Sequence, residues 1–309
     1  MLTRFFRQSK PINYVAIIAL VVVFFIVFYL FLWPFKIDTD LFLHLGALIV
    51  LLVSLGILNF VVRRNVLTRK SSYAIYFFAL YSLSLPVLFD QPSVLISGMF
   101  IMLALRRIIS LRSHLEVQKK IFDAALWIFV ASLFYFWAVL FIAVLYLGIL
   151  LHVAGSYKNW LIPLVSLLVT GILAVAFTLT VDTAMIDSYR YLQLPVYDYT
   201  AYSSPGILIP VSFFAAMYLW CVFRYLGQLG SVSKKMKPSY VLVLATSFVA
   251  IIIAAVFAHA HDGSEIYFLF APLSIISSRY VDTSKSKWFT EMLLWLTLAL
   301  PVLLLIFWF

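Results

Sequence analysis

Long apolar runs, each bounded by charged or turn residues, constrain this chain more than any other feature. A run of about 20 residues is long enough to cross a bilayer as a helix. Inside lipid such a segment has to be helical, because only a helix satisfies its own backbone hydrogen bonds there. The sequence therefore predicts an all-α, polytopic transmembrane helical bundle. The expected runs are 12–33, 41–62, 72–89, 93–111, 122–152, 159–180, 206–227, 239–258, 266–281 and 289–309.

The scarcity of charge supports the same fold class. Charged residues make up 11% of the 309 residues and hydrophobic residues 65%, whereas a soluble domain is roughly 25% charged. No polar stretch is long enough to cover a soluble domain, so residues 1–309 are expected to form a single membrane domain with one larger periplasmic loop at 181–205.

The run 122–152 decides the number of segments. It has 31 residues, too many for one span and few for two. If it crosses twice, the positive-inside rule leaves only Lys36 and Arg190 outside among the 22 basic residues. We therefore expect eleven segments in a bacterial inner membrane, with a cytoplasmic N-terminus and a periplasmic C-terminus. This topology accounts for the net charge of +10, so the charge does not indicate a nucleic-acid partner.

The same topology places eight carboxylates at the periplasmic ends of the helices. Among them, Asp38 and Asp40 are two residues apart in the first outer loop. Such a pair suits a divalent cation, a shared proton or a general base, although Asp40 equally suits the N-cap of the next helix. The sequence predicts no other cofactor and no metal site with a recognised spacing.

A second outer constellation is His259-Ala260-His261-Asp262-Gly263-Ser264-Glu265. Here Glu265 precedes a short apolar helix, and ionisable groups near membrane depth are candidates for function. The alternative is a solvated turn made by Asp262-Gly263 that has no functional role. We predict Asp38, Asp40 and Glu265 as catalytic candidates, with Asp90 and His261 nearby.

Two further groups are candidates for substrate binding. The loop 181–205 carries Tyr189 and Arg190 among several tyrosines and acids, which suit sugar recognition or an interfacial aromatic belt. On the cytoplasmic side, Arg106 and Arg107 at a helix end suit an anionic lipid or polyprenyl phosphate. They are also what any positively charged inner loop contains.

Several stretches resemble a family of uncharacterised inner-membrane proteins of Bacteroidota. They are RNVLTRKSSYAIYFFALYSLSLPVLFDQP, LALRRIISLRS, KIFDAALWIFVASLFYFW, YKNWLIP and SEIYFLFAPLSII. Some members of that family carry the label beta-carotene monooxygenase, an activity of a soluble β-propeller with iron held by four histidines. An all-helical chain whose five histidines are scattered over both faces does not support that activity.

The chain also resembles, in architecture, the GT-C superfold of polyprenyl-phosphate-dependent glycosyltransferases. The resemblance implies a catalytic aspartate in the first outer loop, at Asp38 or Asp40, and a paired short-helix region at 122–152. It also implies a late helix with a basic residue near a tyrosine, where this chain has Glu265 beside Tyr267.

Three functions follow as hypotheses. The first is transfer of a glycosyl or related group from a polyprenyl-phosphate-linked donor at the periplasmic face. The second is a non-catalytic scaffold or assembly subunit of a cell-envelope complex. The near absence of charge from 72–89, 122–152 and 239–258, where only Asp123 is charged, favours the scaffold. The third is a proton-coupled transporter, which ranks last because transporters usually place ionisable groups nearer mid-bilayer.

Overall fold

The computed structural model describes residues 1–32, 41–69, 71–181, 195, 197–258 and 261–307. The sequence predictions at Asp38, Asp40, Tyr189 and Arg190 lie outside the described residues. The α-helices of the described part are α1 Leu2–Phe6, α2 Pro11–Leu32, α3 Leu41–Asn65, α4 Tyr73–Leu83, α5 Pro92–Ser110, α6 Val117–Phe134, α7 Ile142–His152, α8 Tyr157–Val181, α10 Pro205–Gln228, α11 Lys237–Ile252, α12 Tyr267–Thr283 and α13 Lys287–Phe307.

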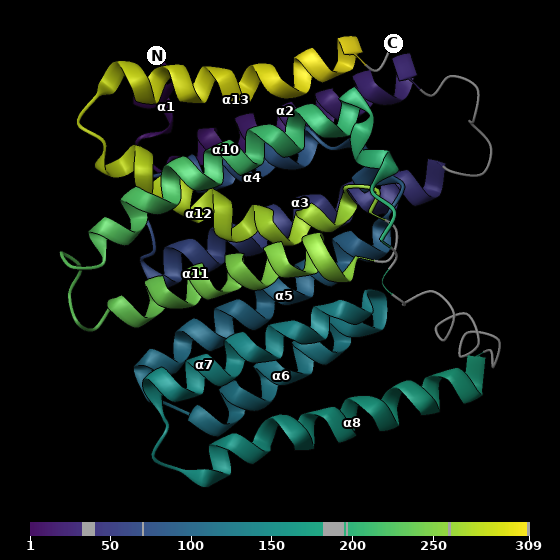
Figure 1. Ribbon diagram of the computed structural model, residues 1–309, viewed down its shortest axis with the longest axis vertical. Coiled ribbons are helices and arrows are strands. Elements are labelled where there is room, and N and C mark those ends of the chain that lie inside the picture. Colours follow the sequence, from purple (N-terminus) through teal and green to yellow (C-terminus); the bar gives the residue numbers. More distant parts are fainter. Residues whose placement is uncertain (33–40, 70, 182–194, 196, 259–260, 308–309) are drawn as a thin grey trace.

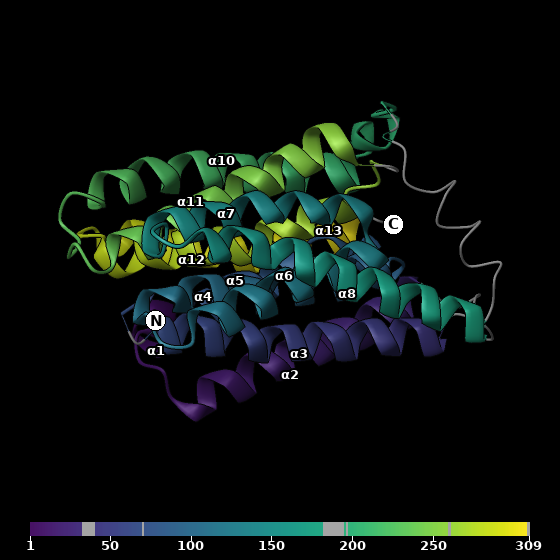
Figure 2. The ribbon, with the colours of Figure 1, turned by 90° about the horizontal axis from the view of Figure 1, so that it is seen from below.

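Short helical turns complete the described chain. They are η1 Pro86–Phe89, η2 Leu111–Ser113, η3 Phe136–Phe141, η4 Thr200–Ser203, the π-helical η5 Ile253–Phe257, and η6 Ser264–Ile266. The helices from α2 to α13 lie side by side in an elongated stack, with α13 near one end of the long axis and α8 at the other (Figures 1 and 2).

Seven of the described helical stretches are long and apolar enough to cross a membrane by length and composition. Four other helices of the bundle are shorter than these seven or carry more charge, namely α4, α6, α7 and α12. This all-α arrangement confirms the predicted polytopic bundle, and the chain is a multi-pass membrane protein.

The run 122–152 folds as two segments, as predicted. The backbone becomes extended at Tyr135, with φ −144° and ψ 103°, between α6 and η3. The far end of α7 then returns beside the start of α6, where the His152 and His114 rings lie 6.5 Å apart. No glycine or proline makes this break; the chain leaves the helix at an aromatic residue that is itself buried.

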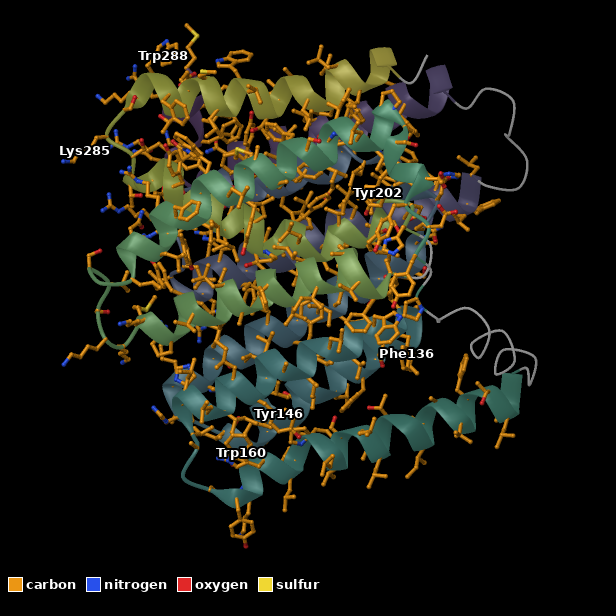
Figure 3. All side chains as sticks on the ribbon, in the orientation of Figure 1. Phe136, Tyr146, Trp160, Tyr202, Lys285 and Trp288 are labelled. Atoms are coloured by element: carbon orange, nitrogen blue, oxygen red, sulfur yellow. The ribbon has the colours of Figure 1, made fainter. Side chains whose placement is uncertain are left out.

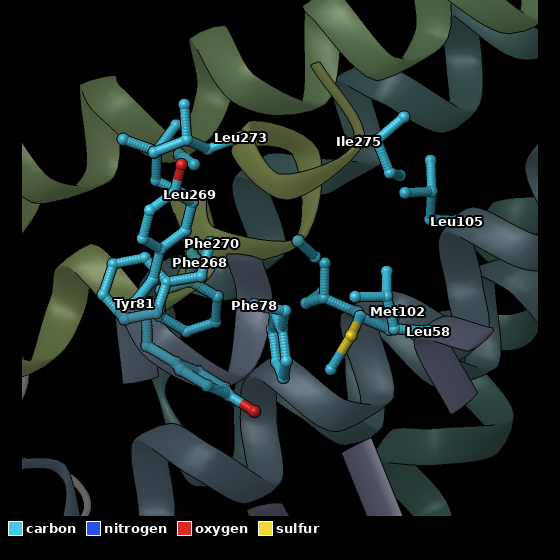
Figure 4. Packing of buried hydrophobic residues seen from close by; sticks show 14 of the residues in the cluster. Leu58, Phe78, Tyr81, Met102, Leu105, Phe268, Leu269, Phe270, Leu273 and Ile275 are labelled. Atoms are coloured by element: carbon cyan, nitrogen blue, oxygen red, sulfur yellow. The ribbon is translucent and has the colours of Figure 1, made fainter. Parts of the chain in front are cut away.

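The centre of the bundle is formed by α4 and α12. All 11 residues of α4 are buried, and α12 packs beside it. Figure 4 shows aromatic and aliphatic side chains in this layer, and α12 also carries buried small residues such as Ser274 and Ser277. Two tyrosine hydroxyl groups of α4 have partners: Tyr81 Oη lies 3.0 Å from Ser277 Oγ, and Tyr76 donates to the Leu294 carbonyl at 2.8 Å. Small residues allow such close helix approach in lipid.

Gly98 shows how close that approach is. A Cβ at this position of α5 would lie 2.4 Å from Cε1 of the fully buried Tyr267 at the start of α12. The glycine therefore lets α5 pack directly against the helix that follows Glu265.

The two ends of the helix stack differ in charge. We name the end with His44, Asp90, Asp198, Asp262 and Glu265 the acidic end, which is on the right in Figure 1. We name the opposite end, where the N-terminus and the turns after α3, α5, α10 and α12 lie, the basic end. Lys285 and Trp288 mark the basic end in Figure 3, and Tyr202 and Phe136 mark the acidic end.

Candidate functional site

At the acidic end, Glu265 is a buried carboxylate held by neutral donors. It lies in η6, directly before α12, and only 2% of it is exposed. Tyr202 Oη donates to Glu265 Oε1 at 2.5 Å, and the Gly263 backbone N–H donates to Oε2 at 3.0 Å. Gly263 has φ +91°, a conformation that favours glycine, so the turn aims its N–H at the carboxylate.

The residue four positions earlier completes this arrangement. His261 is fully buried, with Nδ1 3.7 Å from Glu265 Oε1. Its ring packs against Tyr199, with centroids 4.3 Å apart, and Tyr199 in turn donates to the Ala255 carbonyl at 2.9 Å. Neither His261 ring nitrogen has a hydrogen-bond partner within the described part of the chain.

Burial changes the acidity of this carboxylate. Desolvation raises the pKa of Glu265 from its ordinary 4.5 to about 7, while the hydrogen bond from Tyr202 acts in the opposite direction. A carboxyl group with a pKa near the ambient pH is suited to accept and return a proton. Burial also raises the pKa of Tyr202 well above its ordinary value, so the phenol stays a donor.

Asp262 is held separately in the same turn. Its Oδ1 accepts from the Ser264 backbone N–H at 2.9 Å and from Ser264 Oγ at 2.6 Å. This aspartate therefore stabilises the turn that presents Glu265, in line with the turn that the Asp-Gly sequence indicates. We name Glu265, His261, Tyr202 and Tyr199 the Glu265 cluster.

A second carboxylate at the acidic end contacts a different histidine. His44 Nε2, in the first turn of α3, lies 2.9 Å from Asp90 Oδ1, in the turn between η1 and α5. The His44 side chain is 4% exposed and that of Asp90 is 39% exposed. Asp90 is thus a surface group that fixes the entry of α3 against η1.

The predicted arginine candidates lie at the other end of the bundle. Arg107 Nη2 forms an ion pair with Asp123 Oδ2 at 2.7 Å, joining α5 to α6. The Arg106 guanidinium stacks over the Phe60 ring at 4.2 Å. Neither arginine meets Glu265, so the structure brings together only Glu265 and His261 among the predicted site residues that it describes.

The tyrosine partners of Glu265 could not be paired with it from sequence. Tyr202 lies 63 residues before Glu265, in a loop whose tyrosines were as consistent with an interfacial belt. Among the described residues, no group of three or more His, Cys, Asp or Glu side chains is placed to hold a metal ion. The Asp38–Asp40 cation site remains a prediction, because both residues lie outside the described part.

Comparison with known proteins gives a family but no activity. A family model described as "Family of unknown function (DUF6427)" matches residues 4–309. No curated protein and no solved structure matches the chain. What the Glu265 cluster does must therefore be argued from its own chemistry.

Proposed function

The chain belongs to the family DUF6427, and we propose that it is a membrane-embedded transferase whose general base is Glu265. The donor is a group carried on a polyprenyl phosphate, and the reaction takes place at the acidic end, on the periplasmic side of a bacterial inner membrane. The observation that supports this proposal is a carboxylate 2% exposed with a pKa of about 7 at the end of a membrane bundle.

The chemistry asked of Glu265 is one proton transfer. An acceptor hydroxyl attacks the transferred carbon of the donor and forms a new C–O bond, while its proton passes to Glu265. The bond from that carbon to the phosphate oxygen breaks, and the polyprenyl phosphate leaves with the electron pair. A positioned base of this kind contributes typically about 10²–10⁴-fold in rate.

The neighbours of Glu265 suit that role. Tyr202 and the Gly263 N–H keep the carboxylate oriented, and the Tyr199 ring packed on His261 gives the cluster an aromatic wall of the kind that sugars stack on. Arg190 and Tyr189, which the sequence predicts to bind the donor, belong to the loop that follows α8, outside the described residues.

A transferase assay on the full chain tests the proposal. Purified protein in liposomes is supplied with a panel of radiolabelled hexoses linked to undecaprenyl phosphate and with isolated cell-envelope acceptors. The wild type is expected to transfer label, and Glu265→Gln, which keeps the shape but cannot take the proton, to transfer at least about 100-fold less. Asp198→Asn removes an exposed carboxylate from the same end and is expected to keep full activity.

Two results overturn the proposal. Undiminished transfer by Glu265→Gln would show that Glu265 is not the general base. If the wild type transfers label from no donor of the panel, the chain is not the proposed transferase.

The second candidate function, a scaffold subunit, is favoured by helix α8. It packs chiefly on α6, and 12 of the 24 residues at 157–180 are exposed and apolar, Leu168 and Ile172 among them. Photocrosslinkers placed at these two positions would join α8 to one protein partner if the chain is a scaffold, and to lipid alone if it is not.

The structure gives no comparable support to a transporter. Every described Asp, Glu, Lys, Arg and His of the spanning helices lies within about two turns of a helix end. Transporters place ionisable groups near the bilayer midplane, where this bundle has aromatic, aliphatic and small side chains instead.

A further inference from the structure

A cavity of about 860 Å³ opens at the basic end, away from the Glu265 cluster. Three parts of the chain meet around it: the residues after α3, the last turn of α10 with the α10–α11 connection, and the last turn of α12. Its wall combines apolar side chains such as Val232 and Met236 with the polar Gln228, Ser231 and Thr283.

Three arginines line this cavity, one from each part: Arg69, Arg224 and Arg279. In the described residues, none of their guanidinium groups lies within 4.0 Å of a carboxylate oxygen, although other basic side chains of this end do form ion pairs. We name these residues the arginine triplet.

Each guanidinium group of the triplet is held in place by an uncharged group. Arg69 Nη1 donates to the Asp282 carbonyl at 3.3 Å, and Arg224 Nη2 donates to the Thr283 carbonyl at 3.1 Å. The Arg279 guanidinium carbon lies 5.3 Å from the centroid of the Tyr240 ring. The triplet is therefore preorganised by the end of α12 rather than neutralised.

One carboxylate, that of Asp282, stands close to the triplet, and its charge interacts with those of Arg69 and Arg279. Asp282 Oδ2 accepts from the Arg69 backbone N–H at 2.9 Å. A single carboxylate against three guanidinium groups leaves a positive excess at the cavity.

Arg279 gives a second, independent indication of a ligand site. Its Nε is buried and has no hydrogen-bond acceptor among the described residues. A buried donor of a charged group without an acceptor is costly. An anion in the cavity that Arg279 lines would provide the acceptor and the countercharge together.

From these observations we infer that the arginine triplet binds a phosphate group. Guanidinium groups match phosphate oxygens through parallel hydrogen bonds, and three of them line this one cavity. A site at the ends of spanning helices also lies at the depth of lipid headgroups. The phosphate belongs either to an anionic phospholipid or to a free phosphate ion, and this inference does not rest on the transferase.

The test uses the full chain in phosphatidylcholine nanodiscs, with two arms. In one arm inorganic phosphate is titrated; in the other, phosphatidylglycerol replaces part of the phosphatidylcholine. The thermal unfolding midpoint gives the apparent affinity in each arm. The variants are Arg224→Gln and Arg279→Gln, and the matched control Lys158→Gln removes one exposed charge of the same end from the start of α8.

We expect the ligand of one arm to stabilise the wild type. Each arginine variant should lower the apparent affinity for that ligand at least about tenfold, because one charge-assisted hydrogen bond is lost. Lys158→Gln is expected to change it less than about twofold, as for an exposed charge. Stabilisation by phosphate alone assigns a free phosphate site, and stabilisation by phosphatidylglycerol a lipid headgroup site.

The inference is overturned if neither ligand stabilises the wild type, or if Lys158→Gln weakens binding as much as the arginine variants. Arg224 is exposed, so Arg224→Gln remains informative even if Arg279→Gln fails to fold. Arg224→Lys, which keeps the charge but loses the planar fork, is expected to fall between the wild type and Arg224→Gln.

Discussion

Asp123 at the basic end and Glu265 at the acidic end are held in opposite ways. At the basic end, Asp123 is about one-third exposed and pairs with Arg107 at 2.7 Å, and the exposed Glu116 pairs with Lys119 at 3.1 Å. At the acidic end, Glu265 is buried, and its hydrogen bonds come from a phenol and a backbone amide. A guanidinium group stabilises the charged carboxylate, whereas burial destabilises it.

The comparison separates two effects that the sequence pattern combines. The distribution of basic residues sets which end of the bundle carries which charge. The burial of one particular side chain sets where a proton can be exchanged near neutral pH. An acidic surface alone therefore does not indicate a site. The indication comes from the turn that buries Glu265 and places it in hydrogen-bond contact with Tyr202.

The largest effect expected concerns which end faces outwards. Ser203→Cys at the acidic end and Gly230→Cys at the basic end each place a thiol on an exposed position. With a membrane-impermeant maleimide, we expect intact cells to label Ser203→Cys, and Gly230→Cys to be labelled only after permeabilisation. The native Cys221 is fully buried and serves as the unlabelled background. The reverse labelling pattern would invert the predicted topology.

Next in size is the effect of Glu265 on stability. Its folded pKa of about 7 lies above its ordinary 4.5, so the folded state holds a proton that the unfolded state has lost between these pH values. The wild type is therefore expected to lose stability as the pH rises from about 4.5 to 7, by about 3 kcal/mol in total. Glu265→Gln carries no such charge, and it should unfold at a higher temperature than the wild type at pH 8.

The difference between this variant and the wild type should be much smaller at pH 5, because Glu265 is still protonated in the folded state there and most of the loss falls between pH 5 and 7. A thermal unfolding series in detergent between pH 5 and 8 measures this difference. A gap of constant size across the series would show that Glu265 does not titrate in this range. The gain in stability at pH 8, set beside the expected loss of transfer, is the usual cost of a functional group held in an unfavourable environment.

A smaller effect is expected from the phenol that supports Glu265. Tyr202→Phe removes a hydrogen bond to the charged carboxylate, so the pKa of Glu265 rises further and its ionisation at pH 8 becomes more costly. We expect a loss of about 2 kcal/mol at pH 8 and a smaller one at pH 5, measured in the same unfolding series. Tyr199→Phe is the control: its hydroxyl bonds to the Ala255 carbonyl, so its cost should not depend on pH.

Sequence reasoning could predict the fold because its signals are local. Each span has its own apolar run, and the basic loops alone argued for a break within 122–152, which the extended Tyr135 confirms. Glu265 and His261 could be singled out for the same reason, since they are four residues apart and stand at the start of a short helix.

Contacts between distant segments could not be predicted in this way. His44 meets Asp90 across 46 residues, and Tyr202 meets Glu265 across 63. The arginine triplet draws on three helix ends separated by more than 50 residues each. An apolar helix pattern gives the direction and length of each span but not its neighbours, because lipid-facing and helix-facing positions are similarly apolar.

The smallest effect should come from the best-formed ion pair at the basic end. Asp123→Asn removes the partner of Arg107, but both side chains are about one-third exposed, at 33% and 36%. Water and salt screen such a pair, so the loss should be at most about 1 kcal/mol at low ionic strength and should shrink towards zero at 1 M salt. The unfolding midpoint of Asp123→Asn at low and high salt measures it, with Glu116→Gln, from the more exposed pair, expected to cost still less. A salt-independent loss larger than the effect of Glu265→Gln would mean that Asp123, too, lies in a desolvated site, and the contrast between Asp123 and Glu265 would fail.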